Sequence, residues 1–386
     1  MSELFLIIFF ISILLFFLGT GIWVAISMIG VSAIGMLIFT SRPVGDAMAT
    51  TIWGTSSSWT LTALPLFVWM GEILFRTKLS ENLFKGLAPW MSRLPGGLIH
   101  VNVVGCALFA AISGSSAATV ATVGKMSIPE LRKRNYPEKL LLGSLAGSGT
   151  LGLLIPPSII LIIYGVTVQE SIAKLFIAGI VPGIMIAIFF MFYVIGWSII
   201  NKDVMPTVVE TFSFSRKIKD SVQLMPVIIL IVAVIGSIYM GIATATEAAS
   251  LGVVGALILS FFQKSLNKET FKLSLLGATK TSCMIAFILA GSSFLSLAMG
   301  FTGLPRNLAI WIQEMNLSPY LLIFVLTIFY IILGMFLDGI SAVVLTMAII
   351  EPMVRQAGFD MIWFGVFLVI VVEMAQITPP VGFNLF

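Results

Sequence analysis

The sequence predicts an all-α integral membrane protein made of two inverted-topology repeats, each with a re-entrant helical hairpin and a broken transmembrane helix. Three observations lead to this fold class. Of the 386 residues, 59% are hydrophobic and only 10% are charged, whereas soluble domains carry about 25% charged residues. An ordered series of glycine, serine and proline breaks recurs in the second half of the chain. Lysine and arginine also concentrate in alternate segments between the apolar runs, as membrane topology requires.

The composition excludes several classes of protein. The continuous apolar runs suit transmembrane helices of about 20 residues, whereas a membrane β-barrel needs alternating strands of roughly 10 residues. The net charge of +4 comes from lysines and arginines in loops, so we expect no nucleic-acid partner. One histidine and two cysteines are too few for a Cys/His metal site. Because no basic residue precedes the first apolar run, we expect a retained span rather than a signal peptide.

Residues 1–200 form the first predicted repeat. Its expected membrane spans are residues 4–19, 22–39, 61–75 and 172–200. Residues 40–60 are rich in small polar side chains and are interpreted as a loop. The alternation of charged and apolar residues in 76–93 favours an amphipathic helix at the membrane interface. Residues 201–222 are polar and charged, so we interpret them as a cytoplasmic linker between the repeats.

Two elements of this repeat depart from an ordinary membrane helix. Apolar runs of about half a membrane thickness flank the polar turn at residues 113–119. Backbone outside a helix is tolerated at that depth only where protein buries it or it lines a watery cavity. We therefore interpret this turn as the tip of a re-entrant hairpin and as a ligand site. Residues 140–165 contain GSGT at 147–150 and IPP at 155–157, which predict a broken helix.

Residues 223–386 repeat this order of elements. The expected spans are residues 224–240, 248–262 and 273–299, followed by a second amphipathic stretch at 303–316. The second hairpin tip falls at residues 338–341. The second broken helix covers residues 362–386 and breaks at the sequence TPP, residues 378–380.

Matching residues support an internal duplication. The pairs lie 220 to 225 residues apart: Gly21 with Gly241, Gly71 with Gly291, Gly114 with Gly339, Ser116 with Ser341, and Pro156-Pro157 with Pro379-Pro380. Single glycine matches are common, but an ordered series that ends in two Pro-Pro pairs favours duplication over chance.

The distribution of charge predicts the topology. Four segments that fall on one side hold sixteen of the 21 lysines and arginines: residues 76–93, 132–139, 202–219 and 264–280. Only Arg42, Lys174, Arg306 and Arg355 fall on the other side. Cytoplasmic loops carry the excess of basic residues, so we expect a periplasmic N-terminus and hairpins that enter from opposite sides. Inverted repeats with broken elements are typical of secondary transporters, whose sites lie near the membrane midplane.

The first tip offers two kinds of ligand chemistry. Its hydroxyls and turn carbonyls are hard oxygen donors that suit a small cation, and amides at the start of the outgoing helix favour an anion such as a carboxylate. The hydroxyls belong to Ser113, Ser115, Ser116 and Thr119. Each helix break would free a carbonyl to face the neighbouring tip. The alternatives are close packing of small residues at the tip and a purely structural kink at the break.

Several acids fall at predicted membrane depth, where carboxylates are costly and usually functional. Asp338 could bind a cation or cap the outgoing helix of the second hairpin. Glu373 could carry charge for a cation or a proton, or pair with a neighbour. Structural hydrogen bonds are favoured for Glu72 and Glu247, and we expect His100 near the membrane interface.

Four motifs together resemble the large, DctM-like membrane subunit of tripartite ATP-independent periplasmic (TRAP) transporters. They are SGSSAAT at 113–119, GTLGLLIPPS at 149–158, ATEAA at 245–249 and ITPPVGFN at 377–384. The resemblance implies a permease of the bacterial inner membrane, not an enzyme, that imports a small organic anion with sodium. It implies two partners, a periplasmic substrate-binding protein and a small four-helix membrane subunit. It also implies an elevator-type fold, in which hairpins and broken helices slide against a scaffold.

The same resemblance assigns about two sodium sites and a substrate site. The first sodium site would use Ser113, Gly114, Gly149, Thr150 and Pro156. The second would use Asp338, Gly339, Thr378 and Pro379. The substrate would bind between the tips, at Ser115, Ser116, Thr119, Ile340 and Ser341.

Other functions remain open at this stage. A stand-alone sodium–carboxylate symporter of related fold is the main alternative, followed by a passive channel and by an intramembrane enzyme that uses Asp338 and Glu373. The family usually has a further span after the second break, so we expect the sequence to stop before a last span. The substrate stays open among sialic acid, C4-dicarboxylates, other carboxylates, sulfonates and ectoine-like compounds.

Overall fold

The computed structural model describes residues 3–76, 79–206, 213–222, 224–305, 307, 310, 318–379 and 382. All regular structure in these residues is helical, as predicted. The helices of the first half are α1 (Glu3–Gly19), α2 (Val24–Phe39), α3 (Val44–Ser56), η1 (Trp59–Thr62), α4 (Ala63–Phe75), α5 (Leu79–Met91), η2 (Gly97–Ile99), α6 (His100–Ser113), α7 (Ser116–Lys133), α8 (Glu138–Gly149), α9 (Leu151–Leu154), α10 (Ile159–Thr167) and α11 (Ile172–Ile200). Those of the second half are η3 (Lys202–Val204), α12 (Phe214–Ser221), α13 (Met225–Tyr239), α14 (Ala245–Phe262), α15 (Lys268–Thr302), α17 (Pro319–Gly334), α18 (Gly339–Gln356) and α19 (Met361–Gln376).

Several helices have the length and composition of membrane spans. Among the described residues, α11, α14, α15 and α18 are each long and apolar enough to cross a membrane. The number rises from four to seven if each of three bent helix pairs counts as one span. These lengths fit a multi-pass membrane protein.

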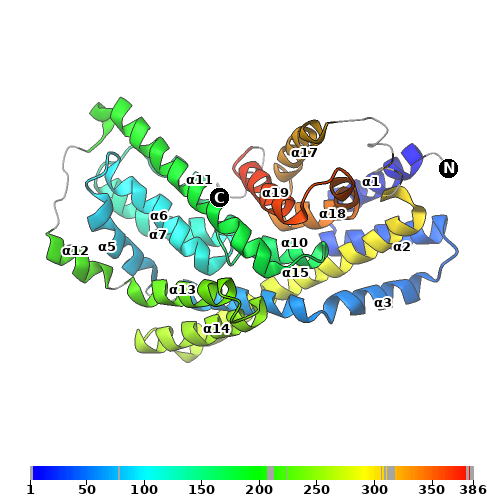
Figure 1. Cartoon of the computed structure of the whole chain (residues 1–386), viewed down its shortest axis with the longest axis horizontal. Coiled ribbons are helices and arrows are strands. Elements are labelled where there is room, and N and C mark those ends of the chain that lie inside the picture. Colours follow the sequence, from blue (N-terminus) through cyan, green and yellow to red (C-terminus); the bar gives the residue numbers. More distant parts are fainter. Residues whose placement is uncertain are drawn as a thin grey trace.

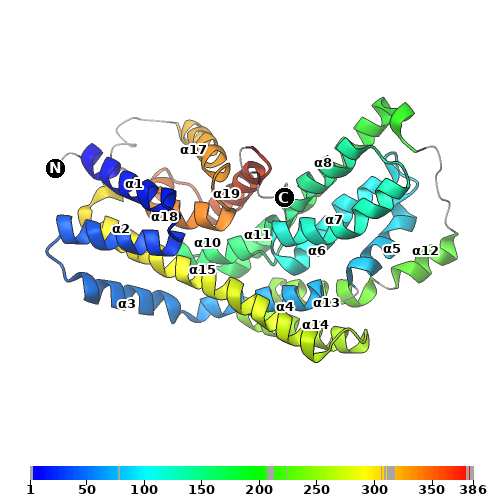
Figure 2. The ribbon, with the colours of Figure 1, turned by 180° about the vertical axis from the view of Figure 1, so that it is seen from behind.

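The molecule is elongated, and helices from the two halves of the chain interleave. At one end α15 lies beside α2 and α3, and at the other end α5 packs against α12 (Figures 1 and 2). Between them, α14 packs against α4, and α10 packs against α18 and α19. The largest fully buried side chains come from both halves: Tyr164, Tyr330, Phe109, Phe176, Phe294 and Phe364. The core is therefore shared between the halves.

The prediction of a loop over residues 40–60 was wrong. Residues Val44–Ser56 form the helix α3, which is bent by 53° from the following segment, Trp59–Phe75. Asp46 lies in the first turn, where a negative charge is favourable. The hydroxyl of Thr50 donates to the carbonyl oxygen of Asp46 at 2.7 Å, which satisfies a polar side chain inside the helix. The polar composition thus reflects an outer helix with no buried residue.

Other predictions had mixed outcomes. The helix expected within residues 76–93 is present as α5, whereas the second amphipathic stretch, 303–316, lies mostly outside the described residues. His100 is buried within the protein, and its Nε2 lies 2.8 Å from the carbonyl oxygen of Pro95; its place near the membrane interface stays a prediction. The bounds of the repeats and their inverted orientation stay predictions.

Candidate functional site

The polar turn predicted at residues 113–119 joins two helices that pack against each other, α6 and α7. Gly114 ends α6 in the left-handed conformation, with φ of 57°, which favours glycine. The hydroxyl of Thr119 donates to the carbonyl oxygen of Ser115 at 2.8 Å and lies 2.9 Å from the hydroxyl oxygen of Ser113. These bonds hold the oxygen-rich tip in one shape. A helical hairpin with its turn at these residues is present, and its re-entrant course in the membrane stays a prediction.

The helix is interrupted at the predicted first break, with a bend of 40° between Glu138–Leu154 and Ile159–Thr167, and the interruption lies against this tip. Extended backbone at Ile155 and Ser158 separates α9 from α10. The amide of Ile159 donates to the carbonyl oxygen of Gly114 at 3.4 Å. On the other side of the break, a Cβ atom at Gly152 would lie 2.6 Å from the carbonyl oxygen of Ser115. Residues at the tip and residues around the break therefore touch through backbone, as the sequence predicted.

The second tip is organised by Asp338. Its carboxylate accepts a hydrogen bond from the amide of Ser341 at 3.1 Å, so it caps α18. The next residue, Gly339, lies against the side-chain amide of Gln376 in the last turn of α19. The second tip and the end of the second broken helix are therefore neighbours. Pro380, in the predicted break, lies outside the described residues.

One side chain of α19 reaches the first tip from the other half of the chain. The hydroxyl of Ser116 donates to Oε2 of Glu373 at 2.7 Å. Both residues are buried, with Ser116 1% and Glu373 3% exposed. Because Gln376 follows Glu373 by three residues, the two side chains share one face of α19. The end of α19 thus contacts both hairpin tips.

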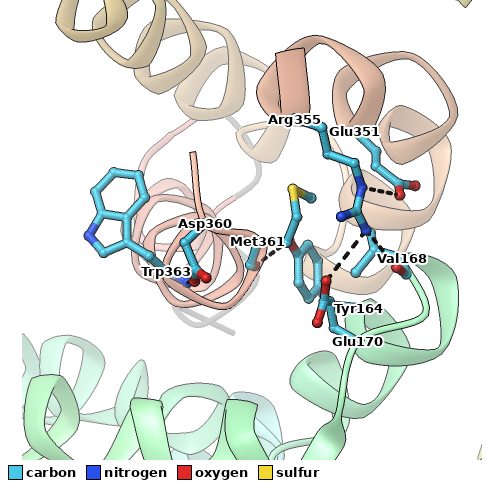
Figure 3. A network of polar contacts seen from close by, with 8 residues as sticks. All are labelled: Tyr164, Val168, Glu170, Glu351, Arg355, Asp360, Met361 and Trp363. Atoms are coloured by element: carbon cyan, nitrogen blue, oxygen red, sulfur yellow. Dashed lines mark hydrogen bonds and ion pairs between the residues drawn. The ribbon is translucent and has the colours of Figure 1, made fainter. Parts of the chain in front are cut away.

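A second set of contacts joins the outer ends of the same elements (Figure 3). The buried hydroxyl of Tyr164, on α10, donates to the carbonyl oxygen of Met361 at the start of α19, at 2.7 Å. Arg355, in the last turn of α18, donates to the carbonyl oxygen of Val168 at 3.0 Å and pairs with Glu351 at 2.9 Å. Helices α10, α18 and α19 are therefore fixed to one another well away from the tips.

The replacement Tyr164→Phe tests this outer contact. We expect it to lower the free energy of unfolding by about 1 kcal/mol, because one buried hydrogen bond is lost. Thermal unfolding of the purified protein in detergent measures the change. Tyr239→Phe is the matched control, since Tyr239 is exposed on α13. Equal melting temperatures for the two variants would contradict the assignment.

Comparison with known proteins decides the family. The family model "Tripartite ATP-independent periplasmic transporter, DctM component" matches residues 10–386. The chain belongs to this family. This TRAP permease is 32% identical to the C4-dicarboxylate TRAP transporter large permease protein DctM of Pseudomonas aeruginosa, over 92% of this chain and 82% of that protein. It is 30% identical to the isethionate TRAP transporter permease protein DctMQ of Oleidesulfovibrio alaskensis, over 96% of this chain and 58% of that protein.

A solved structure supports the fold of the TRAP permease. The structure of MtrF from Neisseria gonorrhoeae, described with a class of antimetabolite efflux pumps, superposes with a TM-score of 0.52. The match covers 88% of this chain and 75% of MtrF at 14% sequence identity. At this identity the likeness concerns the fold alone.

The residues predicted for the first sodium site of the TRAP permease lie around one contact. Ser113 and Gly114 form the tip, and Pro156 is buried in the break. Gly149 packs against Val120 of α7, and the hydroxyl of Thr150 donates to the carbonyl oxygen of Gly147 at 2.6 Å. A ligand role for these residues stays a prediction.

The second predicted sodium site is only partly brought together. Asp338 and Gly339 form the tip, and Gln376 rather than Thr378 makes the side-chain contact with it. The hydroxyl of Thr378 instead donates to the carbonyl oxygen of Met374 at 3.0 Å, and Pro379 is exposed. Capping, one of the two roles open for Asp338, is observed, while cation binding stays a prediction.

The predicted substrate residues differ in how far their polar groups are engaged. The hydroxyls of Ser116 and Thr119 are both used in hydrogen bonds within the protein. The hydroxyl of Ser115 accepts from the amide of Ala118 at 3.4 Å and caps α7. Ser341 is buried and Ile340 is half-buried at the start of α18. Substrate binding by these residues stays a prediction.

Two further acids have structural roles, as the sequence favoured. Glu247 forms a capping box with Thr244 at the start of α14. Glu72 pairs with Arg76 at 3.0 Å. Glu373 was a candidate from the sequence, with pairing to a neighbour as one of its roles, but Ser116 as its partner was missed.

Proposed function

We propose that this permease imports a small organic anion together with sodium, by an elevator mechanism in the bacterial inner membrane. The observation that carries the proposal is the meeting of both hairpin tips at the end of α19, through Ser116 with Glu373 and Gly339 with Gln376. A buried polar centre built from two hairpins and two broken helices is typical of a transport site near the membrane midplane.

Sodium as the coupling ion is supported by the chemistry of the first tip. Its polar groups are hydroxyl and carbonyl oxygens from Ser113, Ser115 and Thr119, with the carboxylate of Glu373 behind Ser116. Hard oxygen donors of this kind suit a small cation. We assign about two sodium ions, one at each tip, as transported ions.

An organic anion as the substrate is supported by relatives and by the helix ends. The two relatives above are named for C4-dicarboxylates and for isethionate. The outgoing helices α7 and α18 both begin at the tips, and helix N-termini favour anions. A carboxylate such as sialic acid or a C4-dicarboxylate would lie between the tips, beside bound sodium.

Two partner proteins follow from the family. A periplasmic binding protein would deliver the substrate, and a small four-helix membrane subunit would hold the permease. The relative named DctMQ is longer than this chain, which covers 58% of it, and that extra length supports a second membrane component. We place the N-terminus in the periplasm because of the charge bias.

Elevator movement is supported by the way the hairpins and broken helices are tied together. Contacts near the tips and at the outer ends, such as Tyr164 with Met361, make α10, α18 and α19 one unit. Helices α2, α3 and α15 lie together (Figure 2), and α15 packs against α18, so we propose them as the scaffold against which this unit would slide.

Uptake by reconstituted liposomes tests the proposal. With the small subunit and the binding protein present, we expect accumulation of a radiolabelled C4-dicarboxylate or sialic acid only under an inward sodium gradient. Potassium in place of sodium should abolish accumulation, as should omission of the binding protein. Sodium-driven uptake by the permease alone would instead indicate a stand-alone symporter. Uptake that is indifferent to sodium would overturn the proposal.

A further inference from the structure

The bond between Ser116 and an ionised Glu373 directs the proton of the serine hydroxyl, because a carboxylate can only accept. Ser116 donates to Oε2 of Glu373 at 2.7 Å. A hydroxyl has one hydrogen and two lone pairs. With its hydrogen directed at Glu373, the oxygen of Ser116 presents only lone pairs to the rest of the tip.

This orientation selects between two ligands for Ser116. An oxygen that presents lone pairs can coordinate a cation, but it cannot donate a hydrogen bond to a carboxylate substrate. The bond to a carboxylate is also charge-assisted, so it polarises the hydroxyl and makes its oxygen a stronger cation ligand. The geometry therefore favours a cation over the substrate at this hydroxyl.

The surroundings keep this arrangement in place. Ser116 is the first residue of α7, and Gly152 brings the backbone of the first break against it. Glu373 lies on α19. The last turn of this helix contacts the second tip, where the side chain of Gln376 lies against Gly339. Both partners are almost fully buried, so bulk water does not compete for the hydroxyl.

We propose that Glu373 is a positioning residue for cation binding, which orients and polarises the Ser116 hydroxyl as a ligand at the first tip. This inference rests on the sodium coupling proposed above. It moves Ser116 from the predicted substrate site to the cation site. In this proposal Glu373 influences cation binding through Ser116 and does not contact the ion directly.

A double-mutant cycle tests the inference. Purified wild-type protein, Glu373→Gln, Ser116→Ala and the double variant are titrated with sodium at constant ionic strength. The readout is the rise in melting temperature, because a ligand that binds the folded state stabilises it. Loss of a charge-assisted hydrogen bond should raise the sodium half-saturation concentration about tenfold in each single variant. The double variant should match Ser116→Ala within about twofold, because both changes remove the same ligand.

Controls separate the possible outcomes. Glu247→Gln is a matched control, because glutamine serves equally well in the capping box of that residue, and it should behave as wild type. If Glu373→Gln does not fold, Glu373→Asp takes its place with the same expectation, since it withdraws the carboxylate. A double variant weakened about a hundredfold would show additive effects and overturn the inference alone. A wild-type protein that sodium does not stabilise, and that takes up substrate without sodium, would overturn the proposed function as well.

Discussion

The variant Gly152→Ala should lose uptake by about tenfold or more, because overpacking of a tight core costs about 1–3 kcal/mol. A Cβ atom at this position would lie 2.6 Å from both the carbonyl oxygen of Ser115 and the Cα atom of Ser116. Backbone atoms cannot move aside as a flexible side chain can. The first tip would be pushed away from the break, which separates the oxygens of the predicted cation site. Sodium-driven uptake and the melting temperature in detergent measure the effect.

The matched control is Gly143→Ala in the preceding helix. Gly143 is exposed on α8, and a Cβ atom there would meet nothing within 4 Å. Alanine is favoured over glycine in a helix by about 1 kcal/mol, so this variant should be at least as stable as the wild type. Similar losses of uptake and of melting temperature in the two variants would contradict a specific role for the contact between Gly152 and the tip.

The variant Asp338→Asn separates capping from cation binding at the second tip. Asparagine caps a helix about as well as aspartate, so the melting temperature should change little. Removal of the negative charge should raise the sodium half-saturation concentration for uptake about tenfold, which corresponds to about 1.4 kcal/mol. Asp338→Ala should show the same loss of sodium affinity together with about 1 kcal/mol of lost stability.

Asp360→Asn is the control for this pair. Asp360 caps α19 through the amide of Trp363 at 2.8 Å, in the same manner as Asp338 caps α18, but at the outer end of the helix. Its replacement should leave sodium affinity unchanged. Wild-type sodium dependence in Asp338→Asn would show that Asp338 is a cap only, and would remove it from the predicted sodium site.

The sequence was most informative about turns and helix interruptions, because neighbouring residues determine the backbone conformation there. Gly114, the capping hydroxyl of Ser115 and the two prolines at 156–157 act on the backbone next to them, so the turn at 113–119 and the interruption at 155–157 could be located from the sequence. The helix α3 was missed because its polar side chains satisfy themselves within the helix, as Thr50 does with Asp46. Composition alone does not distinguish such a helix from a loop.

The site could not be completed from the sequence, because its decisive contacts join distant residues. The bond of Ser116 to Glu373 spans 257 positions, and no spacing rule predicts it. His100 shows the same limit, because neither its burial nor its contact with the carbonyl oxygen of Pro95 could be predicted from the residues around it in the sequence. Side-chain partners of this kind depend on how the helices are packed.

The separation of Ser116 from Glu373 along the chain has a consequence for biosynthesis. Ser116 is made early, whereas Glu373 belongs to α19, the last described helix. Because a chain emerges from its N-terminus at about 5–20 residues per second, the first hairpin must wait for tens of seconds in the membrane without its partner. The hydroxyl of Ser116 needs a temporary acceptor in that interval, such as water, a neighbouring carbonyl or an insertion factor. A nascent chain that stops before α19 therefore lacks the acceptor that the folded protein gives to this hydroxyl.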